Sequence, residues 1–187
     1  QPYYNIPLFV DAIPELSRRH PDAVFWIAGY EGGDGPVRAQ AERLGILPVV
    51  RFLGRVPHDE LQDVVAAADV YITIPSLDAT AVSLLEAMAA GKAIVASALP
   101  STLEWIADGV SGRLVPPGEG APLVEAISAL LADPAGRERM GRAAHVVARA
   151  RADWHKHMAR NEEIYVAAAR AHRTGAPFAI PQPRSWS

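Results

Sequence analysis

The feature that most constrains the fold of this chain is a regular alternation of short apolar runs with stretches of helical spacing. Apolar runs of four to six residues, most of them closed by glycine or proline, predict strands covered on both faces. Because strands and helices alternate through short connections, we predict an α/β fold with a Rossmann-like parallel sheet flanked by helices. The predicted strands are residues 23–28, 49–53, 70–74, 93–96 and 112–115, and the predicted helices among them are residues 5–20, 35–44, 57–68, 82–90 and 101–108.

The sequence after the last predicted strand has a helical pattern throughout. Helices are expected at residues 120–132, 135–150 and 154–172, so the fold ends in an all-helical C-terminal segment. We expect one domain over residues 1–173, followed by an extended or disordered, proline-containing tail over 174–187.

Composition excludes several classes of protein and of site. Half of the 187 residues are hydrophobic and 21% are charged, which is typical of a globular protein. The chain has no cysteine, so disulfides, thiolate metal sites and a catalytic thiol are excluded. No apolar run approaches the roughly 20 residues that span a bilayer, and the N-terminus lacks the basic start and long apolar stretch of a signal peptide. These absences leave the compartment open, and we expect a cytoplasmic protein, either free or associated with a membrane.

Charge is unevenly distributed along the chain. Residues 1–136 carry a net charge of −9 and residues 137–187 one of +6. A basic segment can bind nucleic acid or an anionic membrane surface. We favour a solvated helical face and expect no nucleic-acid partner, because no aromatic residues are interleaved with the cations as they are in an RNA-binding sheet.

Motifs for several common chemistries are absent from the sequence. It contains neither the phosphate-binding G-x-x-x-x-G-K-[ST] nor the dinucleotide-binding G-x-G-x-x-G, and neither the hydrolase elbow G-x-S-x-G nor the zinc motif H-E-x-x-H. His155 and His157 are two residues apart, which places them on different faces of a helix. We therefore expect no metal site.

One segment, residues 75–88, joins a predicted strand to a predicted helix through a loop of small residues. Backbone N–H groups at such a helix N-terminus favour a phosphate or diphosphate. On the helix, Val82, Leu85 and Ala89 are expected to share the core face, with Glu86 pointing elsewhere. From the pattern alone, Glu86 is either part of a solvated face or a carboxylate that accepts hydrogen bonds from the two hydroxyls of a ribose.

Other residues have structural interpretations. Ser101 and Glu104 have the spacing of a capping box at the start of a short helix. Trp26, in a predicted strand, and Trp105, on the short helix, are expected in the core. Tyr165 is expected to pack the last helix against the domain.

Asp78 and Glu86, eight residues apart in PSLDATAVSLLEAMAAGK, resemble the E-x7-E motif of the family 4 (group 1) retaining glycosyltransferases. Five further segments resemble motifs of that family in the same order and spacing, and together they cover the chain from about residue 3 to 165. These segments are PDAVFWIAG at 21–29, RFLGRV at 51–56, AADVYITIP at 67–75, EWIADGVSGRLVP at 104–116, and Met140-Gly141 with Trp154.

This resemblance implies that the chain is the C-terminal, donor-binding domain of a GT-B enzyme, without the N-terminal domain that binds the acceptor. The implied activity is that of a retaining hexosyltransferase that requires neither a metal nor a cofactor. Its substrates would be a nucleoside-diphosphate sugar, by default a UDP-sugar, and a hydroxyl of a glycan or lipid. Such enzymes act in polysaccharide or glycolipid biosynthesis, and we expect this chain alone to be inactive.

The resemblance also implies roles for individual residues. Glu86 would hold the ribose hydroxyls, and Asp78 would contact the transferred sugar near the reacting carbon, which makes these two the implied catalytic residues. The backbone amides of Thr80, Ala81 and Val82 would hold the diphosphate. The other implied donor-binding residues are Ala79 in the same loop, Gly54, Arg55 and Val56 beside the base, and Gly29 and Tyr30 at the floor of the cleft.

The sequence departs from the family pattern in the loop and at the N-terminus. Asp78 stands in place of the first glutamate, and residues 79–81 replace a glycine-containing stretch through which the backbone approaches phosphate. Alanine allows that approach only while φ stays negative. We interpret this loop as a difference in donor specificity. No lysine or arginine precedes Arg18, whereas family members carry cations there that neutralise the diphosphate.

Family members also carry a strand before the first helix, which this sequence does not contain. An open sheet edge or gap is therefore expected, and such an edge invites pairing with another chain. This suggests a different class of function: a non-catalytic nucleotide-sugar-binding or assembly module, with a dimer or strand exchange at the open sheet. The Arg-rich last helix is either an interdomain surface or a peripheral membrane contact. The missing glycine motif disfavours an NAD-type oxidoreductase.

Overall fold

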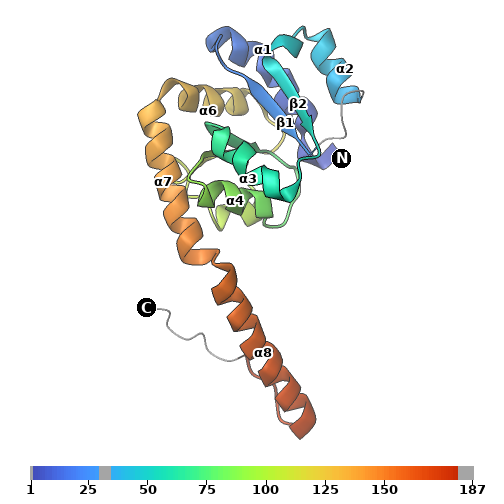
Figure 1. Cartoon of the computed structure of the whole chain (residues 1–187), viewed down its shortest axis with the longest axis vertical. Coiled ribbons are helices and arrows are strands. Elements are labelled where there is room, and N and C mark those ends of the chain that lie inside the picture. Colours follow the sequence, from blue (N-terminus) through green and yellow to red (C-terminus); the bar gives the residue numbers. More distant parts are fainter. Residues whose placement is uncertain (1, 30–34, 181–187) are drawn as a thin grey trace. The chain divides into compact units, whose positions relative to one another are not determined.

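The computed structural model describes residues 2–29 and 35–180, and its helices and strands are shown in Figure 1. They form two compact units, Gln1–Ala148 and Arg149–Ser187. In chain order the elements are η1 (Pro2–Tyr4), α1 (Ile6–Arg19), β1 (Phe25–Ala28), α2 (Pro36–Arg43), η2 (Leu47–Val49), β2 (Val50–Gly54), α3 (His58–Ala67), β3 (Val70–Thr73), α4 (Val82–Ala89), β4 (Ala93–Ser97), α5 (Pro100–Leu103), β5 (Arg113–Val115), α6 (Gly120–Ala132), α7 (Pro134–Arg151) and α8 (Trp154–Thr174).

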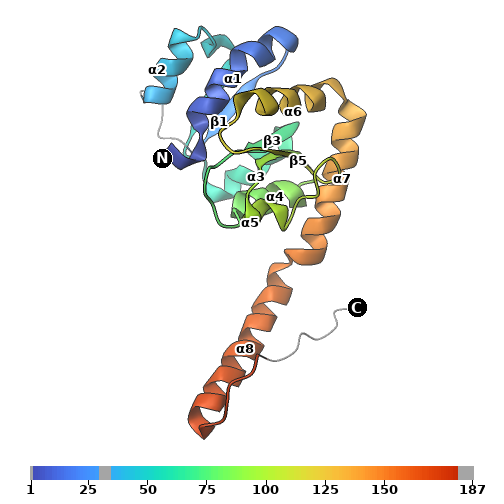
Figure 2. The same cartoon turned by 180° about the vertical axis from the view of Figure 1, so that it is seen from behind.

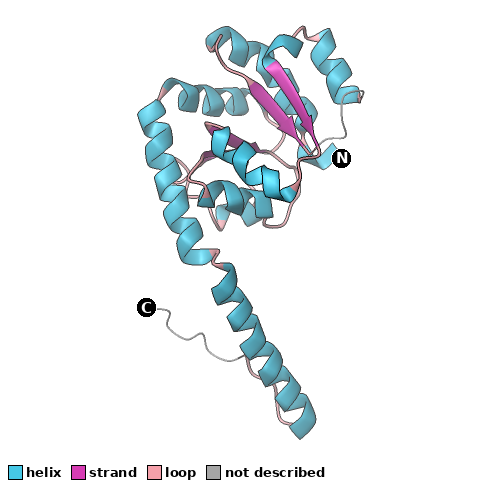
Figure 3. Cartoon of the chain, in the orientation of Figure 1, coloured by secondary structure: helices cyan, strands magenta, loops and turns pink. Residues whose placement is uncertain are grey.

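All strand pairs among the described residues are parallel, and Figure 3 shows the strands with the helices around them. β1 pairs with β2, and β4 lies between β3 and β5. This confirms the five predicted strands and the α/β class with a parallel arrangement. In such folds ligands bind beyond the carboxyl ends of the strands, so the loops after β1, β2 and β3 are the candidate site.

The central strand β4 shows why the sheet must be covered on both faces. All five of its residues are buried. Ala93 and Val95 belong to one apolar cluster with α1 and α6, and Ile94 and Ala96 to a second cluster with α3, α4 and α7. Successive side chains of a strand point to opposite faces, so a strand that is apolar throughout needs helices on both sides. Figure 2 shows α1 and α6 together on one face.

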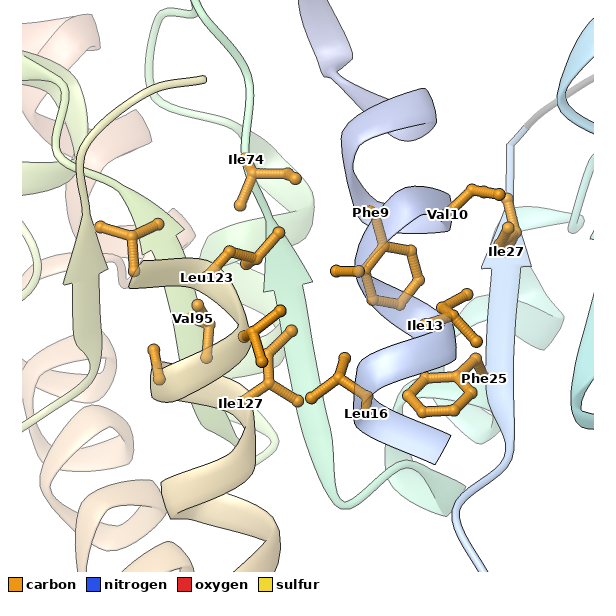
Figure 4. Close-up of a cluster of buried hydrophobic side chains, with 14 of the residues drawn as sticks. Phe9, Val10, Ile13, Leu16, Phe25, Ile27, Ile74, Val95, Leu123 and Ile127 are labelled. Atoms are coloured by element: carbon orange, nitrogen blue, oxygen red, sulfur yellow. The ribbon is translucent and has the colours of Figure 1, made fainter. Parts of the chain in front are cut away.

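β1 and β3 are not hydrogen-bonded to each other in the described part of the chain. In Figure 4 the apolar face of α1, with Ile13 and Leu16, lies between these two strands. A cavity of about 330 Å³ borders Phe25 and Trp26 on β1 and Val70 on β3. The open edge expected from the sequence is therefore present as unpaired edges on both strands.

Two predictions about aromatic residues are wrong. Trp26 is 42% exposed rather than in the core. It alternates with the buried Phe25 and Ile27 along β1, and it lines the cavity just described. Tyr165, which was expected to be covered, is 72% exposed, and α8 has no buried residue among those described.

The predicted capping box of Ser101 and Glu104 is also wrong. The helix begins one residue earlier, at Pro100, so Leu99 occupies the N-cap position. Thr102 fulfils the capping role, since its hydroxyl accepts a hydrogen bond of 2.9 Å from the Leu99 N–H. Proline is favoured in the first turn of a helix, where its missing N–H has no partner in any case, and this shifts the start of the helix. The Ser101 hydroxyl does not cap this helix and donates its hydrogen bond to the Asp78 carbonyl.

Candidate functional site

The loop of residues 78–81 leads from β3 into the N-terminus of α4. Ala81 is the N-cap residue, and no side chain accepts a hydrogen bond as a cap there. The N–H groups that precede Leu84 have no acceptors within the helix, and the helix dipole gives this end a partial positive charge. Asn5 is the one non-glycine residue with positive φ in the part of the chain that the structure describes, so Ala79, Thr80 and Ala81 all have negative φ. The loop therefore meets the condition under which alanine allows a close approach to phosphate.

A cavity of about 520 Å³ lies beside this loop, at the carboxyl ends of β1 and β3. Four residues predicted for the site line it: Gly29 after β1, and Asp78, Ala81 and Val82 from the loop and the start of α4. The volume falls within the usual range of about 300–1,000 Å³ for small-molecule sites.

Glu86 borders a different cavity, of about 430 Å³, between α3 and α4. Its side chain is 24% exposed, and its Oε1 lies 3.8 Å from Nδ1 of His58. His58 begins α3 directly after the loop of residues 54–57, so Glu86 faces the end of that loop. The carboxylate is thus held at the surface of a cavity rather than in an open solvated face.

The prediction that Val82, Leu85 and Ala89 form the core face of α4 is wrong. The buried residues of this helix are Leu84, Ala87 and Met88, whereas Val82 is 69% exposed and Ala89 is exposed as well. The buried stripe is rotated because α4 packs on β4 and α7, and it leaves Val82 at the mouth of the larger cavity.

Tyr71 lies close to both predicted carboxylates. Its hydroxyl donates a hydrogen bond of 2.8 Å to Oγ of Ser83, which ties β3 to the first turn of α4. Burial raises the pKa of Tyr71, and the negative charges of Glu86 and Asp78 raise it further. The phenol therefore remains a hydrogen-bond donor. This contact was not predictable from the sequence, because a tyrosine in an apolar strand has the pattern of a core residue.

The N-terminal residues close one side of the larger cavity. The Asn5 side chain donates to the Ile74 carbonyl at 2.9 Å and to Oγ of Ser76 at 2.8 Å, and the Ser76 N–H donates to the Tyr3 carbonyl at 2.7 Å. Tyr4 lines the cavity, and its pKa is raised first by burial, then by the neighbouring Tyr3 and the charge of Asp78. The described residues that line this cavity include no lysine or arginine. These residues therefore supply no positively charged side chain to neutralise a diphosphate.

The remaining predicted residues end the neighbouring strands. The Gly29 N–H donates to the Gly54 carbonyl at 2.7 Å, and both glycines have positive φ where β1 and β2 end. Arg55 is exposed and Val56 is half-buried in the loop that follows β2. Tyr30 lies outside the described residues.

No group of three or more histidine, aspartate or glutamate side chains in residues 2–29 and 35–180 is arranged to hold a metal ion. In the same ranges, no helix is both long enough and apolar enough to cross a bilayer.

The sequence profile described as "Glycosyl transferases group 1" matches residues 1–147, which is more than three quarters of the chain. The chain belongs to the group 1 glycosyltransferases. The resemblance drawn from the motifs is confirmed, and the matched residues cover all but the last residue of the compact unit that contains the 78–81 loop.

Curated relatives of this group 1 domain include two kinds of enzyme. It is 31% identical over 175 residues to a glycogen synthase of Mycobacterium tuberculosis, covering 94% of this chain and 41% of the relative. It is 35% identical over 156 residues to a phosphatidyl-myo-inositol mannosyltransferase of Mycobacterium leprae, covering 82% of this chain and 40% of the relative. The chain thus spans about two fifths of the length of these relatives.

Solved structures share the fold of the group 1 domain. A sucrose-phosphate synthase from Thermosynechococcus elongatus has a TM-score of 0.83 at 22% identity, covering 91% of this chain and 44% of the other. Anabaena Alr3699/HepE in complex with UDP has a TM-score of 0.73 at 24% identity, covering 81% and 42%. These similarities confirm the fold as that of one half of a GT-B glycosyltransferase.

Proposed function

We propose that this chain is the donor-binding domain of a retaining, metal-independent glycosyltransferase of the hexosyltransferase type. The observation that carries the proposal is the placement of Asp78 and Glu86 on either side of the uncapped N-terminus of α4, each on a cavity. Support comes from the names of the relatives, which transfer sugars, and from the neighbour solved with UDP-glucose.

The proposed donor is a nucleoside-diphosphate sugar, with UDP as the nucleotide. Glu86 accepts hydrogen bonds from the ribose hydroxyls, with the base beside the loop of residues 54–56. The backbone amides of Thr80, Ala81 and Val82 bind the diphosphate. Asp78 contacts the sugar at the larger cavity.

The chemical contribution of the domain is to stabilise the leaving group. Negative charge develops on the diphosphate oxygen as its bond to the anomeric carbon breaks. N–H groups and a helix dipole that already point at this oxygen stabilise the charge without reorganisation. Retention of configuration requires the acceptor hydroxyl to attack from the face that the diphosphate leaves, by front-face attack or through a short-lived ion pair. The acceptor, a glycan or lipid, is bound by a separate N-terminal domain in a cytoplasmic enzyme of polysaccharide or glycolipid synthesis.

The proposal is tested by thermal unfolding of this chain with UDP, GDP, ADP and their sugar conjugates. A ligand at 100 times its Kd stabilises the folded state by about 2.7 kcal/mol, which raises the Tm of a domain of this size by about 5–11 °C. We expect this shift with UDP and UDP-sugars. The absence of a shift with every nucleotide would contradict donor binding by this chain.

A second candidate function rests on the unpaired edges of β1 and β3. A non-catalytic binding or assembly module would use these edges to pair with a second chain. Gel filtration tests this alternative, because a concentration-dependent dimer supports pairing at these edges, whereas a monomer at every concentration contradicts it.

Because the described residues that line the larger cavity include no lysine or arginine, we predict that Tyr4→Lys binds UDP more tightly. Tyr4 lines the cavity together with Asp78 and is 43% exposed. An ammonium group there is expected to contribute about 1 kcal/mol to binding of the diphosphate, after allowance for exposure. UDP affinity should therefore rise about fivefold by calorimetry, and the gain should decrease as salt is added.

The matched control for this prediction is Tyr3→Lys. Tyr3 is equally exposed, at 42%, but does not line the cavity. We expect this control to leave the UDP affinity within twofold of the original, and uridine, which has no phosphate, to bind both variants alike. An equal gain in both variants would show a general effect of net charge.

A further inference from the structure

The 78–81 loop is held from behind by one short segment that includes α5. Oγ of Ser101 donates a hydrogen bond of 3.0 Å to the Asp78 carbonyl. Nε1 of Trp105 donates one of 3.2 Å to Oγ1 of Thr80. Both bonds join residues more than 20 positions apart in the sequence, and both are partly buried. The loop is therefore attached at its first and third residues to the same support.

This support is itself fixed to the central strand. The hydroxyl of Thr102, which is buried, donates a hydrogen bond of 2.5 Å to the carbonyl of Ser97 at the end of β4 and lies 2.9 Å from the carbonyl oxygen of Leu99. Ile106, one residue after Trp105, is buried in the apolar cluster beneath α4. Trp105 packs against the same cluster. The loop is thereby connected to β4, the fully buried central strand of its sheet.

The composition of the loop explains why such a support matters. Residues 79–81 are Ala-Thr-Ala, and no side chain caps the helix that they precede. Backbone N–H groups bind a diphosphate well only when they already point at it before binding, because ordering a loop costs about 1–2 kcal/mol per residue. The hydroxyl of Thr80 provides the attachment point in the middle of the loop.

We propose that Ser101 and Trp105 are positioning residues, which hold the 78–81 loop so that its amides converge on the diphosphate. The proposal rests on the function proposed above for this loop. Neither residue contacts the donor. They act through the Asp78 carbonyl and the Thr80 hydroxyl, and the Trp105–Thr80 pair fixes the part of the loop where this chain differs from the glycine-containing pattern.

The proposal is tested first without a nucleotide, by amide hydrogen exchange. The N–H groups of Leu84 and Leu85 donate to the Ala81 carbonyl, so their exchange reports on release of the loop from α4. Trp105→Phe removes the indole N–H but keeps an aromatic ring in the cluster. Loss of one hydrogen bond, worth about 1 kcal/mol, should increase exchange at these two amides about fivefold.

Four comparisons make this result specific. Thr80→Val should have the same effect as Trp105→Phe, and the double variant should be no worse than either, because both changes remove the same bond. Thr80→Ser keeps a hydroxyl that can accept the hydrogen bond, so the amides of Leu84 and Leu85 should exchange at the original rate. Trp154→Phe, the same chemical change in α8, should have no effect. Unchanged exchange in Trp105→Phe, or additive effects in the double variant, would overturn the proposal.

The second measurement concerns the ligand. Trp105→Phe and Ser101→Ala should each weaken binding of UDP about fivefold and leave binding of uridine within twofold, since only the diphosphate contacts the loop. Equal losses for UDP and uridine would indicate general damage and would contradict a positioning role. Failure of the unaltered chain to bind UDP would overturn the proposed function, whereas the exchange experiment would still decide whether the loop is held.

Discussion

Glu86→Gln is expected to weaken binding of UDP about 10- to 150-fold, which corresponds to the roughly 1.5–3 kcal/mol of a hydrogen bond to a charged group. The amide has the size of the carboxylate, so packing on α4 is preserved. It lacks the charge, and its NH2 group cannot accept a hydrogen bond from a hydroxyl. The measurement is titration calorimetry of the chain with UDP.

The same experiment with 2′-deoxy-UDP identifies the interaction. The original chain should bind the deoxy nucleotide much more weakly than UDP, whereas Glu86→Gln should bind the two almost equally. Asp63→Asn is the control, because Asp63 lines the same cavity as Glu86 and is exposed. An equal loss in this control would show that the charge of the cavity matters and that contact of Glu86 with the ribose does not.

The second large effect is expected on stability, in Gly141→Ala. A Cβ atom at Gly141 would lie 1.9 Å from the carbonyl oxygen of Gly91, where α7 crosses the turn between α4 and β4. The turn is held to the end of α4, because the N–H groups of Gly91 and Lys92 donate hydrogen bonds of 3.0 Å to the carbonyls of Met88 and Ala87. We expect destabilisation of about 3 kcal/mol, the upper end for overpacking, and a fall in Tm of about 6–12 °C.

Gly120→Ala is the matched control for this substitution. Gly120 is also the site of a glycine-to-alanine change in a helix, but its added Cβ would meet Leu8 at an ordinary contact distance of 3.5 Å. Its Tm should remain unchanged or rise slightly, because alanine restricts the unfolded chain. Equal Tm values for the two variants would contradict the close approach of α7 to the turn.

The resemblance to a known family included Met140-Gly141, and the structure supplies a physical reason for the glycine. The backbones of α7 and of the Gly91 turn approach too closely for any side chain. No local pattern in the sequence distinguishes this glycine from Gly136, five residues earlier in the same helix. Glycine is required at position 141 because α7 lies so close to a turn that is 50 residues away in the sequence.

Much of the candidate site was predictable, and the part that was not depends on contacts across the fold. The loop before α4 and the spacing of Asp78 and Glu86 follow from the sequence. Their assignment to two separate cavities, and the contact of Tyr71 with Ser83, do not. The orientation of a side chain into a cavity depends on which neighbouring element packs against its helix or strand.

The sequence by itself determined the positions of the strands and helices, the parallel α/β class and the family. Apolar runs and the glycines and prolines that end them are local signals, and they act before any tertiary contact forms. Only the tertiary structure decided that Trp26 and Val82 are exposed and that Ser101 donates to the 78–81 loop instead of capping its own helix. Burial and the choice of a hydrogen-bond partner are properties of segments brought together from distant parts of the chain, and periodicity within one segment does not contain them.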